Sequence, residues 1–272
     1  MKLKLTSIFI LSIVLISCKS EITKQEVIES NATYQNKGRE LVSKTLDKLG
    51  IYNDLLERKD VVYTYSYQTP DGKKDISTEK YLFDGELSYG LYDKHERTFP
   101  DLTGQIEQGY DGETFWLRHN GETLNDTTRL KRVAFNRPTN FYWFAMMQKL
   151  LDPGLIYDYL GEKKINNTNY EIVKISFTSK DNKPTDIYQL YINKETLFID
   201  QFLFTVADYG VVETPFLMIL KYEEIDDLWI PSKRLYKKSN WEADVLEGPW
   251  IKVNWSDIKF NNNLSKTDFT NM

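Results

Sequence analysis

Short segments in which apolar and polar positions alternate dominate the first half of the chain. Tyr63, Tyr65 and Tyr67 share one side of the segment 61–67, which is the period of a half-buried β-strand. Turn-forming residues separate the runs that follow: Pro70-Asp71-Gly72, Asp84-Gly85, Asp111-Gly112 and Asn120-Gly121. Short strands joined by such turns, with no helix between them, predict an antiparallel meander.

A second series of strand patterns follows residue 154. Its segments are residues 157–164, 170–177, 187–192, 198–206, 216–222, 230–236 and 250–260. Alternation within the segment 198–206 predicts that Phe202 and Phe204 point into the core. It also predicts that Gln201 and Thr205 point towards solvent or a partner.

Two segments have the period of a helix. Residues 34–49 carry their apolar side chains on one face, and Gly50 stands where a C-terminal cap belongs. Residues 141–151 follow a proline, and either Thr139 or Asn140 can cap their first turn. Because this second helix is apolar around most of its circumference, we expect it to be buried on two sides or to line a cavity.

The N-terminal residues have the pattern of an export signal. Lys2 and Lys4 precede an apolar run at residues 5–17, which is too short to span a bilayer as a stable helix. The run ends in Leu15-Ile16-Ser17-Cys18, which resembles the lipobox of bacterial lipoproteins. We therefore expect cleavage before Cys18 and membrane attachment through lipid on its thiol. The alternative is an ordinary secretory signal that ends at an incidental cysteine.

This signal sets the expected organisation and location of the protein. Residues 1–17 form the signal peptide, residues 18–34 a lipidated polar tether, and residues 35–272 a single β domain. Because Lys19 follows the cysteine and no aspartate stands there, we expect the outer membrane. The periplasmic face is favoured over the cell surface.

Composition narrows the functional classes. The formal net charge is −5 and charged residues of both signs are interspersed, so the chain lacks the basic stripe that nucleic acid requires. Cys18 is the only cysteine, which excludes an internal disulfide and a thiolate metal cluster. Aromatic residues make up 14% of the chain, which suits half-buried strands.

The order of helix, hairpins, apolar helix and hairpins resembles the LolA/LolB fold, an open half-barrel closed by helices. Four stretches look like an uncharacterised group of bacterial outer-membrane lipoproteins with that fold: residues 109–116, 159–173, 191–196 and 225–231. The resemblance implies an α+β fold class with an antiparallel curved sheet packed on a few helices. It implies no activity, because none is established for the group. An anchored relative such as LolB is nearer in plan than LolA, which is a soluble carrier.

No catalytic motif stands out. His95 and His119 are isolated, and we expect both in surface or hairpin positions. The acidic cluster at residues 223–227 lacks the glycine and the closing glutamate of a calcium loop, so we expect a solvated loop. We therefore assign no catalytic residue, no metal ligand and no cofactor.

The leading hypothesis is a non-enzymatic envelope lipoprotein that binds a lipid or another apolar ligand. The ligand would lie between the helix at 141–151 and the strand that carries Trp116, since methionine adapts to irregular apolar shapes. The candidate ligand-binding residues are Trp116, Trp143, Met146, Met147 and Leu150. The alternative is a glycan-binding or scaffolding lipoprotein with a filled core, and a hydrolase with paired carboxylates is a third, less favoured hypothesis. We assign no protein partner.

Overall fold

The computed structural model describes residues 36–179 and 184–271. The expected signal peptide at 1–17, the tether at 18–34 and the lipidated Cys18 lie outside these ranges, so they stay predictions. No helix within the described ranges is long and apolar enough to cross a membrane.

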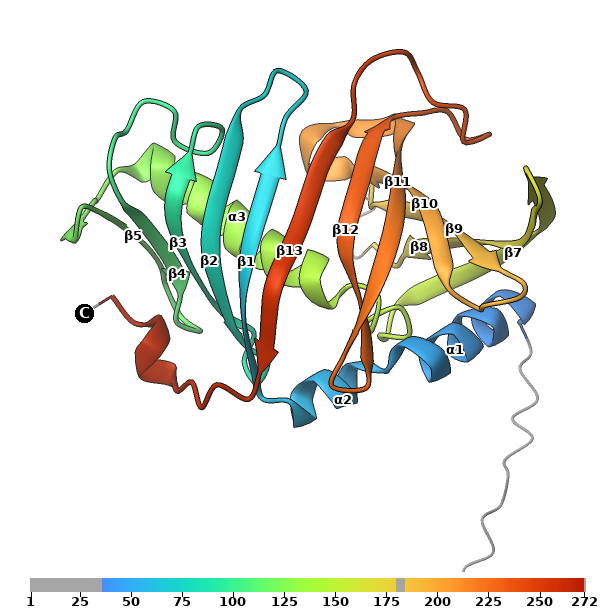
Figure 1. Cartoon of the computed structure of the whole chain (residues 1–272), viewed down its shortest axis with the longest axis horizontal. Coiled ribbons are helices and arrows are strands. Elements are labelled where there is room, and N and C mark those ends of the chain that lie inside the picture. The colour runs from blue at the N-terminus through green and yellow to red at the C-terminus, as the bar shows by residue number, and fades with distance from the viewer. Residues whose placement is uncertain (1–35, 180–183, 272) are drawn as a thin grey trace, which may run out of the picture. The chain divides into compact units, whose positions relative to one another are not determined.

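One antiparallel sheet of thirteen strands forms the framework (Figure 1). Its first half contains β1 (Asp60–Gln68), β2 (Lys74–Leu82), β3 (Leu87–His95), β4 (Ile106–Tyr110), β5 (Phe115–His119) and β6 (Glu122–Thr123). Its second half contains β7 (Leu155–Ile165), β8 (Thr168–Phe177), β9 (Ile187–Asn193), β10 (Ile199–Val206), β11 (Val211–Ile225), β12 (Leu228–Lys238) and β13 (Ile251–Phe260). Two short 3₁₀ helices, η1 (Ala207–Tyr209) and η2 (Lys266–Phe269), follow β10 and β13. The predicted antiparallel meander, with turns after β1, β2, β4 and β5, is confirmed.

The two halves meet at the pair formed by the first and the last strand. The sheet order is β6-β5-β4-β3-β2-β1-β13-β12-β11-β10-β9-β8-β7. Within each half, strands that follow one another in sequence lie side by side, and only the β1–β13 junction pairs strands that are far apart in sequence. Tyr65 of β1 lies opposite Trp255 of β13 in the register of the junction. The chain must therefore travel from β6 at one edge to β7 at the other, and helix α3 makes that crossing.

Helix α3 (Thr127–Ala145) begins 14 residues before the predicted start at Phe141 and ends before the predicted end at Leu151. Asp126 caps it, because its side chain accepts a hydrogen bond of 2.8 Å from the backbone N–H of Arg129. The predicted cap at Thr139 or Asn140 is wrong, because the helix continues through Pro138. A proline inside a helix usually ends or bends it, but packing of a long helix on a sheet can outweigh that local cost.

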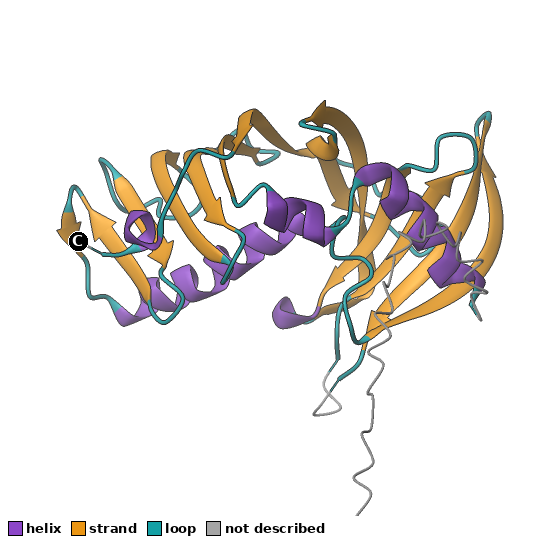
Figure 2. Ribbon diagram, turned by 90° about the horizontal axis from the view of Figure 1, so that it is seen from below, coloured by secondary structure: helices purple, strands orange, loops and turns teal. Residues whose placement is uncertain are grey.

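Packing on both sides of Pro138 explains why the helix persists there. Val133, Arg137, Phe141 and Phe144 are buried along one side of α3, and Figure 2 shows the long helix running along one face of the sheet. The ring of Phe144 lies 5.0 Å from that of Tyr63 and 5.2 Å from that of Trp255. These aromatic contacts hold α3 over the β1–β13 junction.

The N-terminal helices follow the predicted pattern more closely. Helix α1 (Lys37–Leu49) ends at Gly50, whose backbone N–H donates to the Leu46 carbonyl, so the predicted cap is confirmed. Gly50 has a φ of 95°, and a Cβ there would lie 2.3 Å from Leu228. Both the conformation and the close approach require glycine. The short helix α2 (Tyr52–Glu57) then leads into β1.

Strand β10 shows where the predicted alternation holds and where it fails. Phe202 and Phe204 are buried as predicted, but Thr205, predicted to face solvent, is only 1% exposed. The Thr205 hydroxyl instead accepts a hydrogen bond from the Ile187 backbone N–H. Leu203 on the same outer face is also buried, in a cluster with Trp241 and Trp250. The outer face of the sheet is therefore covered here by residues of the β12–β13 connection, which strand alternation alone does not reveal.

Candidate functional site: a cavity between α3 and the sheet

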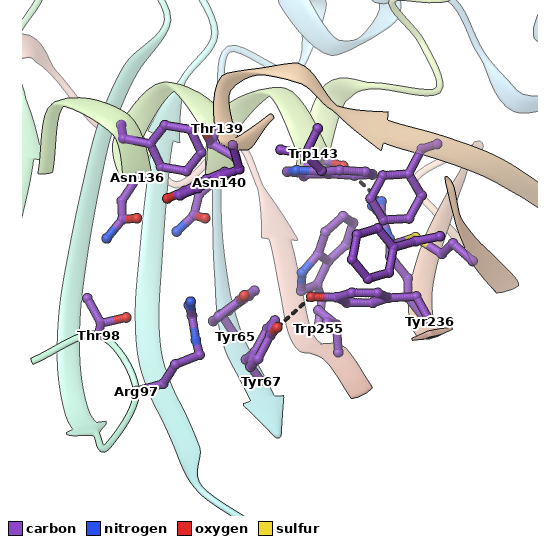
Figure 3. Close-up of a pocket in the computed structure, with 18 of the residues that line it drawn as sticks. Tyr65, Tyr67, Arg97, Thr98, Asn136, Thr139, Asn140, Trp143, Tyr236 and Trp255 are labelled. Carbon is purple, nitrogen blue, oxygen red and sulfur yellow. Dashed lines mark hydrogen bonds between the residues drawn. The ribbon is translucent and has the colours of Figure 1, made fainter. Parts of the chain in front are cut away.

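A cavity of about 410 Å³ lies between α3 and the inner face of the sheet (Figure 3). Its strand-side lining comes mainly from β1 and β10–β13, and its helix-side lining from α3. Aromatic rings provide much of the wall: Tyr63, Tyr65, Tyr67, Phe135, Trp143, Phe204, Tyr209, Phe216, Tyr236 and Trp255. A volume of this size is typical of a small-molecule site, and it shows that the aromatic face is not completely filled.

The helix side of the cavity is polar at one end and aromatic at the other. Asn136, Thr139, Asn140 and Trp143 line it at intervals of three and four residues, which places them along one face of α3. The adjoining stripe of α3, with Phe141 and Phe144, is buried in the core. The same helix therefore anchors itself to the sheet with one stripe and lines the cavity with another.

The strand side carries tyrosine hydroxyls among apolar rings. The Tyr67 hydroxyl is hydrogen-bonded to the Tyr236 hydroxyl, which joins β1 to β12 across β13 (Figure 3). Tyr236 also lies edge-on to Phe204 and Phe216 of β10 and β11, with ring centroids 5.8 Å apart in both cases. This wall can contact an apolar body through ring faces and a polar group through hydroxyls.

A buried guanidinium also lines the cavity. Arg234 of β12 is only 2% exposed, and its Nη2 donates to the Trp143 carbonyl at 2.8 Å. Its Nε donates to the Pro231 carbonyl at 3.1 Å, and its guanidinium carbon lies 4.0 Å from the centroid of the Trp255 ring. Burial lowers the pKa of Arg234 to about 10, an effect that Tyr222 and Tyr63 partly offset. The side chain therefore still carries its positive charge at neutral pH.

Two further arginines line the same cavity near Thr98. Arg97 is paired with the fully buried Asp75 at 3.1 Å, and it stacks over the Tyr67 ring. Arg132 of α3 donates to the Thr98 carbonyl. Figure 3 shows Arg97 and Tyr65 across the cavity from Asn136 and Asn140. Among the described residues that line this cavity there is no aspartate or glutamate, so its charged groups are all cationic.

A second cavity, of about 480 Å³, shares one wall with the first. Phe135, Thr139, Trp143 and Val206 line both, so the two lie on either side of the contact between α3 and the end of β10. Tyr142, Phe177 and Tyr188 add aromatic surface to the second cavity, and Asp186 and Asp208 make it the more acidic of the two.

Of the five candidate ligand-binding residues, one lines the two cavities described above. Trp143 lines both cavities. Met146, Met147 and Leu150 are at most 1% exposed and pack in the hydrophobic core beside α1 and β7–β11, past the end of α3. Trp116 of β5 is buried elsewhere, against Gly109 and Tyr89, and its indole N–H donates to the Phe269 carbonyl at 2.7 Å.

The tyrosines of β1 and β12 and the three arginines line the cavity, although the sequence pattern did not predict them as ligand-binding residues. The alternation of Tyr63, Tyr65 and Tyr67 gave the signal for a shared face, and all three line the cavity. Nothing in the sequence marks Arg234 as a cavity residue, because a Lys233-Arg234 pair on a strand has the pattern of a solvated surface. Lys233 is indeed exposed, whereas Arg234 points to the opposite side and is buried.

The two histidines each lie beside backbone carbonyl oxygens. His95 lies at the end of β3 and is buried, so it does not have a surface position. Its two ring nitrogens lie 2.9 Å from the Phe99 and Gly104 carbonyl oxygens. His119 lies at the end of β5, 2.6 Å from the Thr103 carbonyl. Within residues 36–179 and 184–271, no group of three or more His, Cys, Asp or Glu side chains is placed to hold a metal ion. The geometry of the cavity fits binding through rings, hydroxyls and guanidinium groups.

One protein-family model matches part of the chain. Residues 122–214 match the model of a family of unknown function (DUF6503). A comparison with curated protein sequences gave no match. The match to the family model runs from β6 to the start of β11 and so includes all of α3.

Solved structures are similar over most of the described chain. A DUF1329 family protein from Desulfovibrio piger has a TM-score of 0.50 and 14% identity, over 86% of this chain and 98% of its own. A putative outer membrane lipoprotein-sorting protein domain from Vibrio parahaemolyticus has a TM-score of 0.48 and 14% identity, over 86% and 96% of the two chains. A LolA superfamily protein from Nitrosomonas europaea has a TM-score of 0.45 and 11% identity, over 81% and 97%.

At such identities the likeness concerns the fold alone. The structure has the fold class expected from the sequence, a large antiparallel sheet with a few helices packed on it. Among the described strands, β6 and β7 form the two unpaired edges of this sheet. The chain therefore has an α+β fold built on one open antiparallel sheet, and residues 122–214 match a family of unknown function.

Proposed function

We propose that this protein is an envelope lipoprotein that binds an amphipathic small molecule in the cavity between α3 and the sheet. The observation that carries the proposal is the aromatic cavity of about 410 Å³, which also presents amide and hydroxyl groups. Ligand sites combine a mostly apolar wall with a few polar groups that orient the ligand. The proposed role is carriage or retention of a lipid-like molecule, with no chemical step.

The site differs from the one expected at residues 141–151 and Trp116. The cavity lies further towards the N-terminus of α3, at Asn136, Thr139 and Asn140, and it faces β1 and β10–β13. Met147 is completely buried in the core, so a charge there would test stability more than ligand binding.

The glycan-binding alternative has less support. Stacking on a sugar ring needs exposed tryptophan faces, but Trp116 and Trp255 are 5% and 3% exposed. Trp143 and Trp229 pack partly buried against the main core, and Trp241 and Trp250 against the outer cluster. The scaffold alternative requires a filled inner face, and the cavity speaks against it.

The proposal is tested by titrating the Cys18→Ser protein, purified without detergent, with a fluorescent fatty acid. We expect saturable binding at micromolar concentration. Thr139→Trp should weaken it at least about tenfold, because the new ring would occupy the wall shared by the two cavities. Lys131→Trp introduces the same ring at an exposed position of the same helix and should bind as the parent does. A folded parent protein that binds no fatty acid would remove the proposal.

A further inference from the structure

Arg234 is a buried cation without an anionic partner among the described residues. Its two hydrogen-bond acceptors are backbone carbonyls, of Trp143 and Pro231, and its third contact is the face of Trp255. Carbonyl dipoles and a ring quadrupole offset part of the desolvation cost, but neither supplies a negative charge. Buried charges in proteins are normally paired, so this arrangement calls for an explanation.

The same chain pairs its other fully buried arginine. Arg137 of α3 is bonded to Glu79 at 2.8 Å, and both side chains are 0% exposed. Arg97, at the edge of the same cavity as Arg234, has Asp75. Arg234 therefore departs from the pattern of its neighbours, and it does so at a cavity wall, where a ligand can reach it.

The surroundings of Arg234 contain hydroxyls and rings but no described carboxylate. The ionisable groups that act on it are Tyr222, Tyr63 and Tyr65. The remaining charged residues of the cavity lining are Arg97 and Arg132. Arg97 is paired with Asp75, but no described residue that lines the cavity offers a carboxylate to Arg234, so an anion that enters the cavity would be attracted to it.

We infer that the ligand of this cavity carries an anionic oxygen head group, a carboxylate or a phosphate, and that Arg234 binds that group. The inference rests on the proposed function and adds the class of ligand to it. A guanidinium presents donors in a planar fork that fits a carboxylate or phosphate, and in a water-poor site such bonds are strong. Phe204, Val206, Phe216 and Met218 line the cavity from β10 and β11 and would contact the apolar chain.

The test compares three ligands of equal chain length with different heads: dodecanoate, dodecyl phosphate and dodecanol. Each displaces the fluorescent fatty acid from the Cys18→Ser protein at neutral pH. We expect both anions to bind about 10- to 100-fold more tightly than the alcohol, the range expected for hydrogen bonds to a charged group. A preference between carboxylate and phosphate identifies which head group the site is built for. Inorganic phosphate, which lacks a chain, should compete weakly.

The variants assign the effect to one side chain. Arg234→Gln should abolish the preference for the anions while leaving dodecanol binding within about twofold. Lys233→Gln removes the adjacent charge on the other side of β12 and should keep the full preference. Arg132→Gln should keep most of it. Arg234→Lys keeps the positive charge but loses the planar pair of N–H donors. It replaces the glutamine variant in the comparison of head groups if that variant unfolds.

The possible failures are distinct. Equal binding of alcohol and anions by the parent protein would overturn the inference and leave the proposed function standing. An anion preference that survives Arg234→Gln, or that disappears in Arg132→Gln instead, would overturn the assignment to Arg234. Binding of none of the three ligands would remove the proposed function itself.

Discussion

Arg137 of α3 and Glu79 of β2 form an ion pair at 2.8 Å in which both side chains are fully buried. The Arg137 guanidinium also donates to the Tyr92 hydroxyl at 3.1 Å, and Glu79 accepts from the Ser77 hydroxyl at 2.6 Å. Gly90 leaves room for the pair, because a Cβ there would lie 2.6 Å from Arg137. This network fixes α3 to the first half of the sheet directly beside Pro138, where the helix is locally weakest.

Breaking this pair should destabilise the protein strongly. Arg137→Met leaves the Glu79 carboxylate buried without a cation, and we expect a loss of about 3–5 kcal/mol in the free energy of unfolding. Urea unfolding followed by tryptophan fluorescence measures it. The double variant Glu79→Gln, Arg137→Met should recover part of the loss, because no buried charge then remains. A single-variant loss below about 1 kcal/mol, typical of an exposed pair, would contradict the burial seen here.

Alkaline pH should destabilise the protein through its buried tyrosines. Burial raises the pKa of Tyr92 to about 12, with Arg137 acting in the opposite direction. An unfolded tyrosine has a pKa of about 10, so above that pH the unfolded chain releases a proton that the folded chain keeps. The contribution of Tyr92 is thus complete below about pH 10 and is lost as the pH rises towards 12.

Comparison with Tyr92→Phe isolates this contribution. Between about pH 9 and about pH 11, the free energy of unfolding should fall by about 1 kcal/mol less in the phenylalanine variant than in the parent. Tyr63 and Tyr81, also with raised pKa values through burial, add to the loss in both proteins. Arg234 acts in the opposite sense, because its lowered pKa lets the folded chain lose this buried charge above about pH 10, which relieves a destabilising contribution. Identical pH profiles for parent and variant would show that Tyr92 ionises freely.

Strand β10 offers a direct test of the register. Phe204 is 3% exposed and lies among Trp143, Phe216 and Tyr236, so Phe204→Ala should cost about 3–5 kcal/mol. Gln201→Ala, at a half-buried position of the same strand, should cost about 1 kcal/mol or less. Chemical unfolding of the two variants side by side measures the difference. Equal, small losses at both positions would mean that Phe204 does not face the core.

The predicted anchor is tested separately from the fold. Cys18→Ala removes the thiol to which diacylglycerol would be attached, so the mature protein should leave the membrane fraction or accumulate as an uncleaved precursor. Fractionation and mass spectrometry of the mature N-terminus distinguish the two outcomes. A variant that is still cleaved after Ser17 and still sediments with membranes would show that another feature anchors the chain.

Local patterns were sufficient to predict most strands of this fold. Alternating tyrosines in β1 and turn pairs such as Asn120-Gly121 depend on neighbouring residues, and the structure has them as expected. The extent of α3 could not be read in this way. Pro138 is a local signal for a helix boundary, but the buried Arg137 and Phe141 on either side of it make contacts with distant strands that outweigh the signal.

The cavity was less predictable than the fold for the same reason. Met146 and Met147 have the apolar character of a ligand site, yet they lie past the end of α3 and are surrounded by other core side chains. Arg234 looks like a surface residue until the register of β12 and the position of Trp143 are known. A cavity is defined by what several distant strands leave empty, and no single segment of sequence encodes that volume.

Ligand chain length should report the size of the cavity. Each methylene buried from water contributes about 0.8 kcal/mol, or roughly fourfold in affinity. Affinity should therefore rise along the series octanoate, decanoate and dodecanoate, and then level off where the chain fills the available space. In Thr139→Trp the rise should stop at a shorter chain, because the added ring reduces the volume on both sides of the Phe135–Trp143 wall. Affinities that climb equally with chain length in both proteins would place the chain outside this cavity, on the surface of the protein.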